Sequence, residues 1–289
     1  MRKLSATMLC LLALVSASYA QEIDVSSLQK VGPVTGLVKT ERGIILNCRD
    51  NSQVQLTVLA PDLIRVRASF TKPIPTSDHS WAIAKENWDT PPWSLTETGQ
   101  SITVATAELE VVINRSPVLI DFRDARTHET INADEQPMVY DGKGTLAKIQ
   151  FDPAAGMFVA AAKKLGFDEH FYGLGEKAAR LDKRRGFFVN WNSDTPGYTE
   201  GRDPIYQTIP FYLGLQRGSA YGIFFDNSYR SYFDFGRLSQ EHVWFGAEGG
   251  EMNYYFFYGP SIKKILGRYA DLTGHMPLVP LWADRKSVV

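Results

Sequence analysis

The chain has 289 residues and nearly balanced charge, with 31 basic and 32 acidic side chains and a formal net charge of −1 at pH 7. This balance argues against a nucleic-acid partner, because binding a polyanion requires clustered basic charge. The length is enough to bury a large apolar core, and it leaves open one large β domain or two smaller ones.

The first twenty residues predict a cleavable secretory signal. A basic start at Arg2 and Lys3 is followed by an apolar run over residues 8–15, and a small-x-small pattern ends at Ala20. The run is too short to span a bilayer, and no later stretch is long and apolar enough to do so. We expect a signal peptide over 1–20 and a secreted or periplasmic protein without membrane attachment after cleavage. An N-terminal membrane anchor is the alternative.

Cys48 is the only cysteine of the expected mature chain, because Cys10 lies in the signal. A single cysteine excludes an internal disulfide even in an oxidising compartment, so stability must come from the apolar core. Cys48 follows the apolar residues Ile44, Ile45 and Leu46. We expect it to be a buried small hydrophobic residue.

Alternation of apolar and polar residues predicts β-strands over most of the chain. In residues 64–70, Ile64 and Val66 alternate with Arg65 and Arg67, which is the pattern of a strand buried on one face. Further strands are expected at 53–59, 102–104, 109–113, 118–122, 145–151, 209–215, 221–225 and 252–257. Many short strands separated by turn formers indicate an all-β fold, a large antiparallel β-sandwich.

A long irregular crossing and a single late helix interrupt this pattern. Residues 71–93 contain four prolines and no strand pattern, so we expect an irregular segment that is a surface crossing or has a functional role. Pro260 suits a first helical turn, and Gly274 suits a C-terminal cap. Between them, apolar residues at three- and four-residue steps predict one buried helix face: Ile262, Ile265, Leu266, Tyr269 and Leu272. The prolines beyond Gly274 predict a domain boundary, with the sandwich over 21–275 and a link over 276–283.

The densest group of candidate functional residues begins at His170. Gly173 and Gly175 permit a tight turn or a close approach of two backbones. They do not form a dinucleotide fingerprint, because a third glycine and a following helix are missing. We interpret Glu176 as a carboxylate that accepts hydrogen bonds from turn amides, with a buried acid as the alternative.

A second group combines aromatic and hydrogen-bonding side chains. Trp191 and Tyr198 offer flat apolar faces, while polar groups come from Asn192, Asp194 and Thr195. Sugars present apolar C–H faces and a rim of hydroxyls, so this combination suits carbohydrate binding. An Asx-rich turn with its aromatic rings in the core explains the same composition, and the residues alone do not decide between the two.

Seven blocks then occur in the order in which a known family has them. They are FYGLGEK, WNSDTPGY, DPIYQTIPF, YGIFFDNS, YFDFG, GGEMNYYFFYGP and YADLTGHMPLVPLWA. In this order the chain resembles the N-terminal domain of glycoside hydrolase family 31, which includes α-glucosidases and α-xylosidases. The resemblance covers roughly Val34 to Ala283 and is strongest from His170 onward. It implies a galactose-mutarotase-like β-sandwich packed against a catalytic (β/α)₈ barrel.

The resemblance also implies where the chemistry takes place. In the family an aspartate nucleophile and an aspartate acid/base lie on barrel strands, and retaining hydrolysis holds such carboxyls about 5–5.5 Å apart. A sandwich loop closes the subsite of the non-reducing sugar, and here it matches Trp191 to Tyr198. By this match Asp194 is the expected ligand of that sugar's hydroxyls and Thr195 a weaker candidate, because a carboxylate accepts two charge-assisted hydrogen bonds. The implied substrate is an α-linked oligosaccharide or glycoside, and no cofactor is implied.

The sequence departs from the family after Ala283, where the family continues through a glycine into the first barrel strand. A barrel takes about 250 residues, and we expect none of it in this chain. Residues 284–289 are expected to be a non-native tail, because Asp-Arg-Lys-Ser-Val-Val is what the start of a common sequencing adapter encodes. The expectation is therefore a catalytically inactive N-terminal fragment of a secreted retaining α-glycoside hydrolase.

Two other functions remain open. A free-standing carbohydrate-binding module would end near residue 283, but Trp282 and the proline-rich link would then leave apolar surface uncovered. An aldose epimerase on the same architecture would need a Glu base and a His acid, and His170 with Glu176 is the nearest match. None of the five histidines falls at ligand spacing with another, so we expect no metal site.

Overall fold

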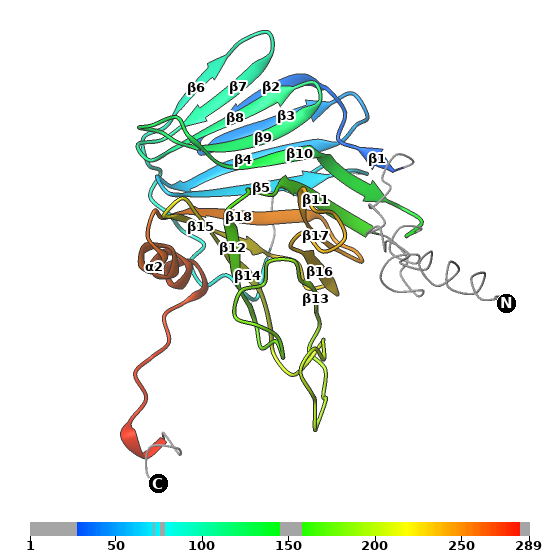
Figure 1. Cartoon of the computed structure of the whole chain (residues 1–289). Helices are drawn as coiled ribbons and strands as arrows, with labels where there is room; N and C mark the ends of the chain where they lie inside the picture. The colour runs from blue at the N-terminus through cyan, green and yellow to red at the C-terminus, as the bar shows by residue number, and fades with distance from the viewer. Residues whose placement is uncertain (1–27, 72, 76–78, 145–157, 284–289) are drawn as a thin grey trace, which may run out of the picture.

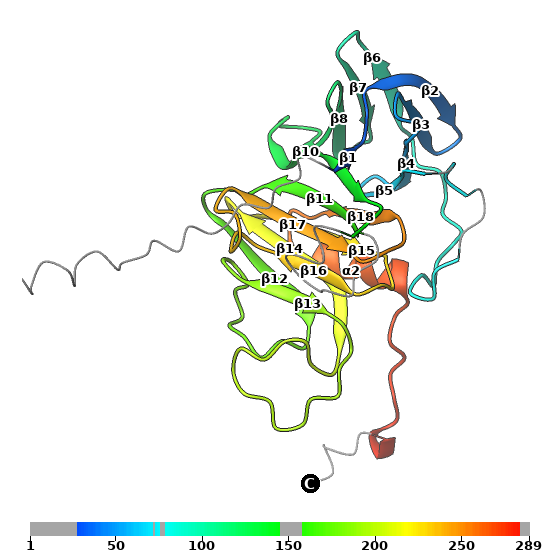
Figure 2. The same ribbon diagram turned by 90° about the vertical axis from the view of Figure 1, so that its right-hand side faces the viewer.

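Two antiparallel β-sheets pack face to face in the computed structural model of the chain (Figure 1, Figure 2). The structure describes residues 28–71, 73–75, 79–144 and 158–283. The expected signal peptide, the strand expected at 145–151 and the expected tail at 284–289 lie outside these residues. In the described part of the chain, no helix is long and apolar enough to cross a membrane.

The first sheet contains ten described strands. In spatial order they are β13 (Phe187–Asn190), β16 (Ser231–Asp234), β17 (His242–Ala247), β11 (Phe158–Lys164), β10 (Thr130–Asp141), β9 (Val118–Asp124), β8 (Leu109–Arg115), β7 (Ser101–Ala105) and β6 (Ser94–Glu97). The short strand β1 (Gln29–Lys30) pairs with β10 outside this order. The register between β10 and β11 shifts on either side of Gln136, and next to this irregularity Asp134 is only 2% exposed.

The second sheet contains eight described strands. In spatial order they are β12 (Glu169–Gly175), β14 (Thr208–Gln216), β15 (Ser219–Phe225), β18 (Met252–Tyr258), β5 (Leu63–Ser69), β4 (Gln53–Ala60), β3 (Gly43–Cys48) and β2 (Val34–Thr40). The late strand β18 joins the N-terminal strands to the later ones. Its residue Tyr254 pairs with Phe225 on one side and with Val66 on the other.

Apolar side chains from both sheets fill the space between them. In β4 the alternate residues Val54, Leu56 and Val58 are fully buried, as the period-two pattern predicts. Phe122 from the first sheet and Phe256 from the second stack with their ring centroids 3.9 Å apart. The prediction of an all-β antiparallel sandwich is confirmed.

The outer face of β5 differs from the prediction of a strand buried on one face. Arg67, expected at the surface, is only 3% exposed. Its guanidinium donates to Glu251 Oε1 at 2.6 Å and to the Pro75 carbonyl at 3.4 Å. The irregular segment that includes Pro75 and residues 79–93 packs over this face of the sheet. The alternation of residues along one strand does not show whether another segment of the chain packs over its outer face.

The expected late helix is α2, which spans Ile262–Thr273. The prediction that Pro260 lies in the first helical turn is wrong, because Ser261 is the N-cap and Pro260 lies before the helix. Ile265 and Leu272 are buried against the second sheet, which confirms part of the expected apolar face. Tyr269 also packs there, stacked on Phe211 with ring centroids 4.2 Å apart, whereas Ile262 and Leu266 are 36% and 46% exposed.

The irregular crossing is also confirmed for its described residues, 71, 73–75 and 79–93, which form no strand or helix. Trp88 is its buried anchor, and the backbone N–H of Ala84 donates to the Leu272 carbonyl at the end of α2. Beyond α2 the described chain is extended as far as a short 3-10 helix, η1, at Leu281–Ala283.

The one described cysteine, Cys48, is buried as expected and is 5% exposed at the end of β3. Burial raises the pKa of its thiol to about 11, so the thiol stays protonated at neutral pH. A covered, protonated thiol acts as a small apolar side chain.

Candidate functional site

The loop that was matched to a sugar-binding loop projects from the sandwich on the same side as the segment after α2 (Figure 1, Figure 2). It connects β13 to β14 and spans residues 191–207. Its rings are exposed: Trp191 is 46%, Tyr198 47% and Tyr206 40% accessible. The alternative in which the rings of Trp191 and Tyr198 fill the core is therefore wrong.

A buried ion pair fixes the base of this loop. Lys177, two residues after β12, donates from Nζ to Asp203 Oδ1 at 2.8 Å and to the Val189 carbonyl at 2.6 Å. Asp203 in turn accepts a hydrogen bond from the backbone N–H of Val189. The Lys177 side chain is 1% exposed, and burial lowers the pKa of its ammonium group despite the neighbouring carboxylate. Because an unpaired buried charge is costly, the pair holds Asp203 against β13.

Hydrogen bonds within the loop give it a fixed shape. Asn192 Oδ1 accepts from the N–H and the hydroxyl of Thr208, each at 2.9 Å. The backbone N–H of Ser193 donates to the Ile205 carbonyl at 3.2 Å, which joins the two arms of the loop. Thr195, the second predicted sugar ligand, donates its hydroxyl hydrogen to the Ser193 carbonyl at 3.3 Å. A hydroxyl has one hydrogen, so Thr195 has only lone pairs left for a ligand.

Asp194, the main predicted sugar ligand, is an exposed residue of this loop. Among the residues that the structure describes, none donates a hydrogen bond to its carboxylate. Partial burial and then the nearby Asp194 charge raise the pKa of the Tyr206 phenol. Tyr206 meets Tyr198 edge to face, with ring centroids 5.9 Å apart. The loop thus presents a carboxylate acceptor near the exposed Tyr206 ring, which in turn meets the exposed Tyr198 ring.

The glycine pair makes the close backbone approach that the sequence predicts. Gly173 and Gly175 have φ angles of +121° and +75°, and a Cβ at Gly173 would lie 2.5 Å from the Phe211 carbonyl oxygen. The interpretation of Glu176 is wrong. Its side chain is exposed, and no turn amide of the described chain donates to its carboxylate.

The pair that an epimerase would need is not brought together. His170 Nδ1 is 2.7 Å from Asp182 Oδ2, and this hydrogen bond raises the pKa of the imidazole. Glu176 is exposed past the opposite end of β12, and within the described chain no contact joins it to His170. In the described residues there is no group of three or more potential metal ligands.

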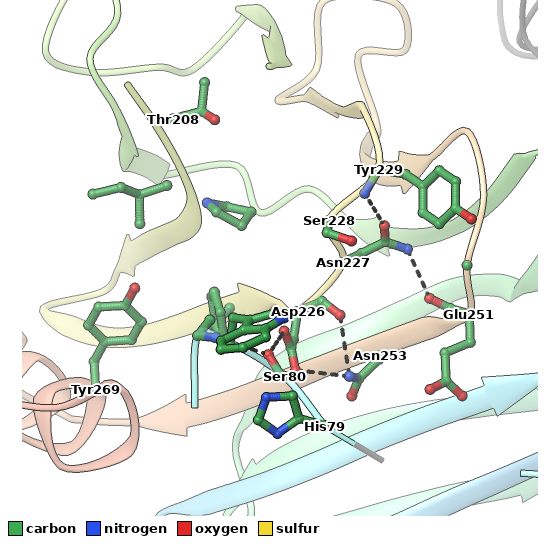
Figure 3. Close-up of a pocket in the computed structure, with 16 residues that line it drawn as sticks. His79, Ser80, Thr208, Asp226, Asn227, Ser228, Tyr229, Glu251, Asn253 and Tyr269 are labelled. Atoms are coloured by element: carbon green, nitrogen blue, oxygen red, sulfur yellow. Dashed lines mark hydrogen bonds between the residues drawn. The ribbon is translucent and has the colours of Figure 1, made fainter. Parts of the chain in front are cut away.

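Two adjoining hollows open beside the base of the loop. The larger, of about 490 Å³, lies between α2, the segment at 79–82 and the connection from β15 to β16 (Figure 3). The smaller, of about 330 Å³, lies between that connection and the neighbouring ends of β13 and β14. Five residues line both hollows: Thr208, Pro210, Asn227, Ser228 and Tyr229. Both volumes lie in the range of small-molecule sites.

A hydrogen-bond network fixes the wall of the larger hollow. Ser80 Oγ donates to Asp226 Oδ1 at 2.6 Å, and Asn253 Nδ2 donates to Asp226 Oδ2 at 3.1 Å (Figure 3). The backbone N–H of Tyr229 donates to Asn227 Oδ1 at 2.8 Å. Sequence reasoning missed these residues because they come from segments far apart in the chain. The one available signal was the pair Asp226-Asn227 directly after a buried strand.

Comparison with known proteins decides the family. A family profile described as the Glycosyl hydrolase 31 N-terminal galactose mutarotase-like domain matches residues 53–234. The chain belongs to this family. It is 33% identical over 255 residues to Alpha-glucosidase 2 of Bacillus thermoamyloliquefaciens, which covers 88% of this chain and 30% of that protein. It is also 40% identical over 119 residues to Alpha-xylosidase XylQ of Lactiplantibacillus pentosus, covering 41% of this chain and 15% of the relative.

Solved structures share the architecture of this glycoside hydrolase 31 domain. The GH31 dextranase FjDex31A of Flavobacterium johnsoniae matches with a TM-score of 0.78 and 29% identity, over 88% of this chain and 30% of that chain. The cycloalternan-forming enzyme of Listeria monocytogenes, at 20% identity, shares the fold with a TM-score of 0.71 over 88% of this chain and 23% of its own. The domain therefore spans less than a third of the length of these relatives.

Proposed function

We propose that this glycoside hydrolase 31 domain forms part of the sugar-binding rim of a retaining α-glycosidase. The observation that carries the proposal is the Asp194 carboxylate, which is exposed, receives no hydrogen bond within the described chain, and lies near the Tyr206 phenol, whose ring meets that of Tyr198. Relatives with the same domain are named α-glucosidase, α-xylosidase and dextranase. The proposed substrate is therefore an α-linked oligosaccharide or glycoside.

The loop residues act by binding and orienting the sugar. The Asp194 carboxylate accepts hydrogen bonds from two neighbouring hydroxyls, and the tyrosine faces cover the apolar C–H side of the ring. The Lys177–Asp203 pair holds the loop in place before the sugar arrives, so less conformational entropy is lost on binding. The reacting carboxylates belong to the barrel that the family resemblance implies, and bond cleavage is assigned to no residue of this domain.

The proposed setting is outside the cytoplasm, in the periplasm or the medium. The basic and apolar pattern of residues 1–20 supports export and removal of the signal. The proposed partner is the catalytic barrel of the same parent chain. Packing against such a barrel suits the placement of the 191–207 loop and the segment after α2 on one side of the sandwich (Figure 1).

Replacement of Asp194 in the full-length parent enzyme tests the proposed rim. Asp194→Ala is expected to lower kcat/KM for an aryl α-glucoside or α-xyloside by about 10- to 100-fold, because a hydrogen bond to a charged group contributes about 1.5–3 kcal/mol. Asp194→Asn keeps one acceptor and should lose less. Glu200→Ala removes an exposed carboxylate from the same loop and is the matched control. If Asp194→Ala and Glu200→Ala have the same steady-state kinetics, Asp194 does not bind the substrate.

A further inference from the structure

The smaller hollow has a lining without charge. Its nine described lining residues comprise three asparagines, three residues with aliphatic hydroxyls, two aromatic residues and one proline. The larger hollow, in contrast, includes the carboxylates of Asp226 and Glu251. A neutral lining rich in amides and hydroxyls favours a neutral ligand with many hydroxyl groups over an anion, a cation or a purely apolar molecule.

Asn190 gives this hollow an unused hydrogen-bonding group. The residue ends β13, lines the hollow and is only 4% exposed. Neither its Oδ1 nor its Nδ2 atom has a hydrogen-bond partner within the described chain. Both atoms are covered in the unliganded chain, so the amide must turn toward the hollow before a ligand can reach it. A buried polar group without a partner costs about 1–3 kcal/mol, so this turn is favoured when the ligand supplies both a donor and an acceptor. Neighbouring hydroxyls of a pyranose ring supply both.

Two aromatic rings on preformed walls complete the hollow. Trp191 follows Asn190 and is 46% exposed, and Tyr229 on the β15–β16 connection is 54% exposed. The hydrogen bond from Tyr229 N–H to Asn227 Oδ1 fixes one wall, and the hydrogen bonds from Thr208 to Asn192 Oδ1 fix the other. Figure 3, which draws the larger hollow, shows the two shared residues Thr208 and Tyr229 apart from each other, on separate segments. Aromatic faces of this kind cover the apolar C–H face of a sugar.

We propose that this hollow is a second glycosyl-binding site, separate from the rim at Asp194, which takes one pyranose unit of an α-glucan. On binding, the covered Asn190 amide turns into the hollow and bonds two neighbouring hydroxyls, while the rings of Trp191 and Tyr229 contact the apolar face. The preference for a neutral pyranose follows from the lining, whereas the choice of an α-glucan rests on the proposed function. A protein segment would meet three amides in this hollow, although the buried centre of a stable interface is mainly apolar.

Titration of the 289-residue chain with isomaltotriose and with maltotriose tests this site, with binding followed by isothermal titration calorimetry. We expect saturable binding, which Asn190→Ala and Trp191→Ala each weaken at least tenfold. Trp81→Ala is the matched control, because Trp81 is 96% exposed and lines the larger hollow without lining the smaller one. This control should bind both sugars as tightly as the unmodified chain does.

Folding of the variants is checked by their melting temperatures. Asn190→Ala removes no side-chain hydrogen bond of the unliganded chain, so its melting temperature should be unchanged. If the melting temperature of Asn190→Ala falls, the affinity of Trp191→Ala tests the site instead. The Trp191 ring is half exposed, so its removal disturbs folding less. The proposal is overturned if neither sugar binds saturably, or if all variants bind equally, and the hollow then holds water or a protein segment. If one of these outcomes is found while Asp194→Ala still lowers kcat/KM of the parent enzyme, only the second site is disproved and the proposed rim at Asp194 stands.

Discussion

At the scale of single residues, the carboxyl group of Asp234 makes stability depend on pH. Asp234 ends β16 and is 1% exposed. Burial raises its pKa from 3.8 to about 6, although the backbone N–H groups of Leu238 and Arg237 donate to it and lower the pKa. Because the folded pKa lies above the unfolded one, the folded chain binds the extra proton between these values. The contribution of the protonated Asp234 carboxyl to stability is complete below about pH 4 and is lost as the pH rises through about 6.

Asp234→Asn should remove this pH dependence, since the amide is neutral at every pH and keeps an oxygen acceptor. Between pH 4 and pH 7 the unmodified chain should therefore lose stability relative to the variant. The difference in their free energies of unfolding, variant minus unmodified chain, is expected to grow by up to about 3 kcal/mol. Urea denaturation at a series of pH values measures this difference. The control is Asp89→Asn, at an exposed residue of the irregular segment. A difference that stays constant with pH for Asp234→Asn would contradict the expectation.

Individual residues could be predicted where their role follows from their own surroundings in the sequence. Asp194 and Trp191 were found in this way, from an aromatic and polar loop that matches a family block. The buried Lys163 was not found, because it donates to Asp134 and to the Tyr254 hydroxyl, 29 and 91 residues away. Asn190 was missed for another reason. Asn190 became a candidate only because its side chain has no hydrogen-bond partner within the described chain, and the residue type alone does not show this.

At the scale of elements, the end of β12 illustrates a strand shaped by glycine. The register between β12 and β14 shifts between Gly173 and Gly175, and the intervening Leu174 has a φ of +70°. The shift brings the β12 backbone so close to Phe211 in β14 that a side chain at Gly173 has no room. This irregular end of β12 places Lys177, and through it the base of the 191–207 loop.

Gly173→Ala should therefore destabilise the domain by about 2 kcal/mol or more, because a φ of +121° is strained for alanine and its Cβ would contact the Phe211 carbonyl oxygen. Gly99→Ala is the matched control, since no atom lies within 4 Å of the added Cβ and the φ of Gly99 lies outside the positive range that strains alanine. Denaturant midpoints of the two variants give the comparison. Equal midpoints would mean that the backbone at Gly173 relaxes without cost.

Strands were predicted well where one face meets the core and the other meets solvent or a polar neighbour. β4 and β8 are of this kind, and both follow the period-two pattern. β11 was missed because its run from Phe158 to Lys163 is buried on both faces and shows no alternation. β13 and β16 have four residues each, which is too short for a periodic signal.

At the scale of the whole molecule, the domain covers about 30% of the length of Alpha-glucosidase 2 and of the dextranase. The family resemblance places both catalytic aspartates on the barrel. The 289-residue chain by itself is therefore expected to release no nitrophenol from aryl α-glucosides or α-xylosides, in an assay calibrated with an active α-glucosidase. Turnover that stays with this chain through two different chromatographic steps would show that the chemistry resides in these residues.

The fold and the exposed position of the 191–207 loop could be predicted because the seven family blocks keep their order along the chain. The two hollows could not. Their walls combine residues 79–82, 208–210 and 226–229 with the ends of strands from both sheets. Such a surface exists only after the sheets have packed together, and no continuous stretch of sequence encodes it.

The position of β18 has a consequence for synthesis of the chain. Asn253 in β18 bonds Arg65 in β5 across 188 residues of sequence. At about 5–20 residues per second, the ribosome needs roughly 10–40 s to make this intervening stretch. During that time β5 has an open edge that can pair with other chains. A nascent chain arrested before Met252 is therefore expected to need a holding chaperone that covers this edge until β18 is made.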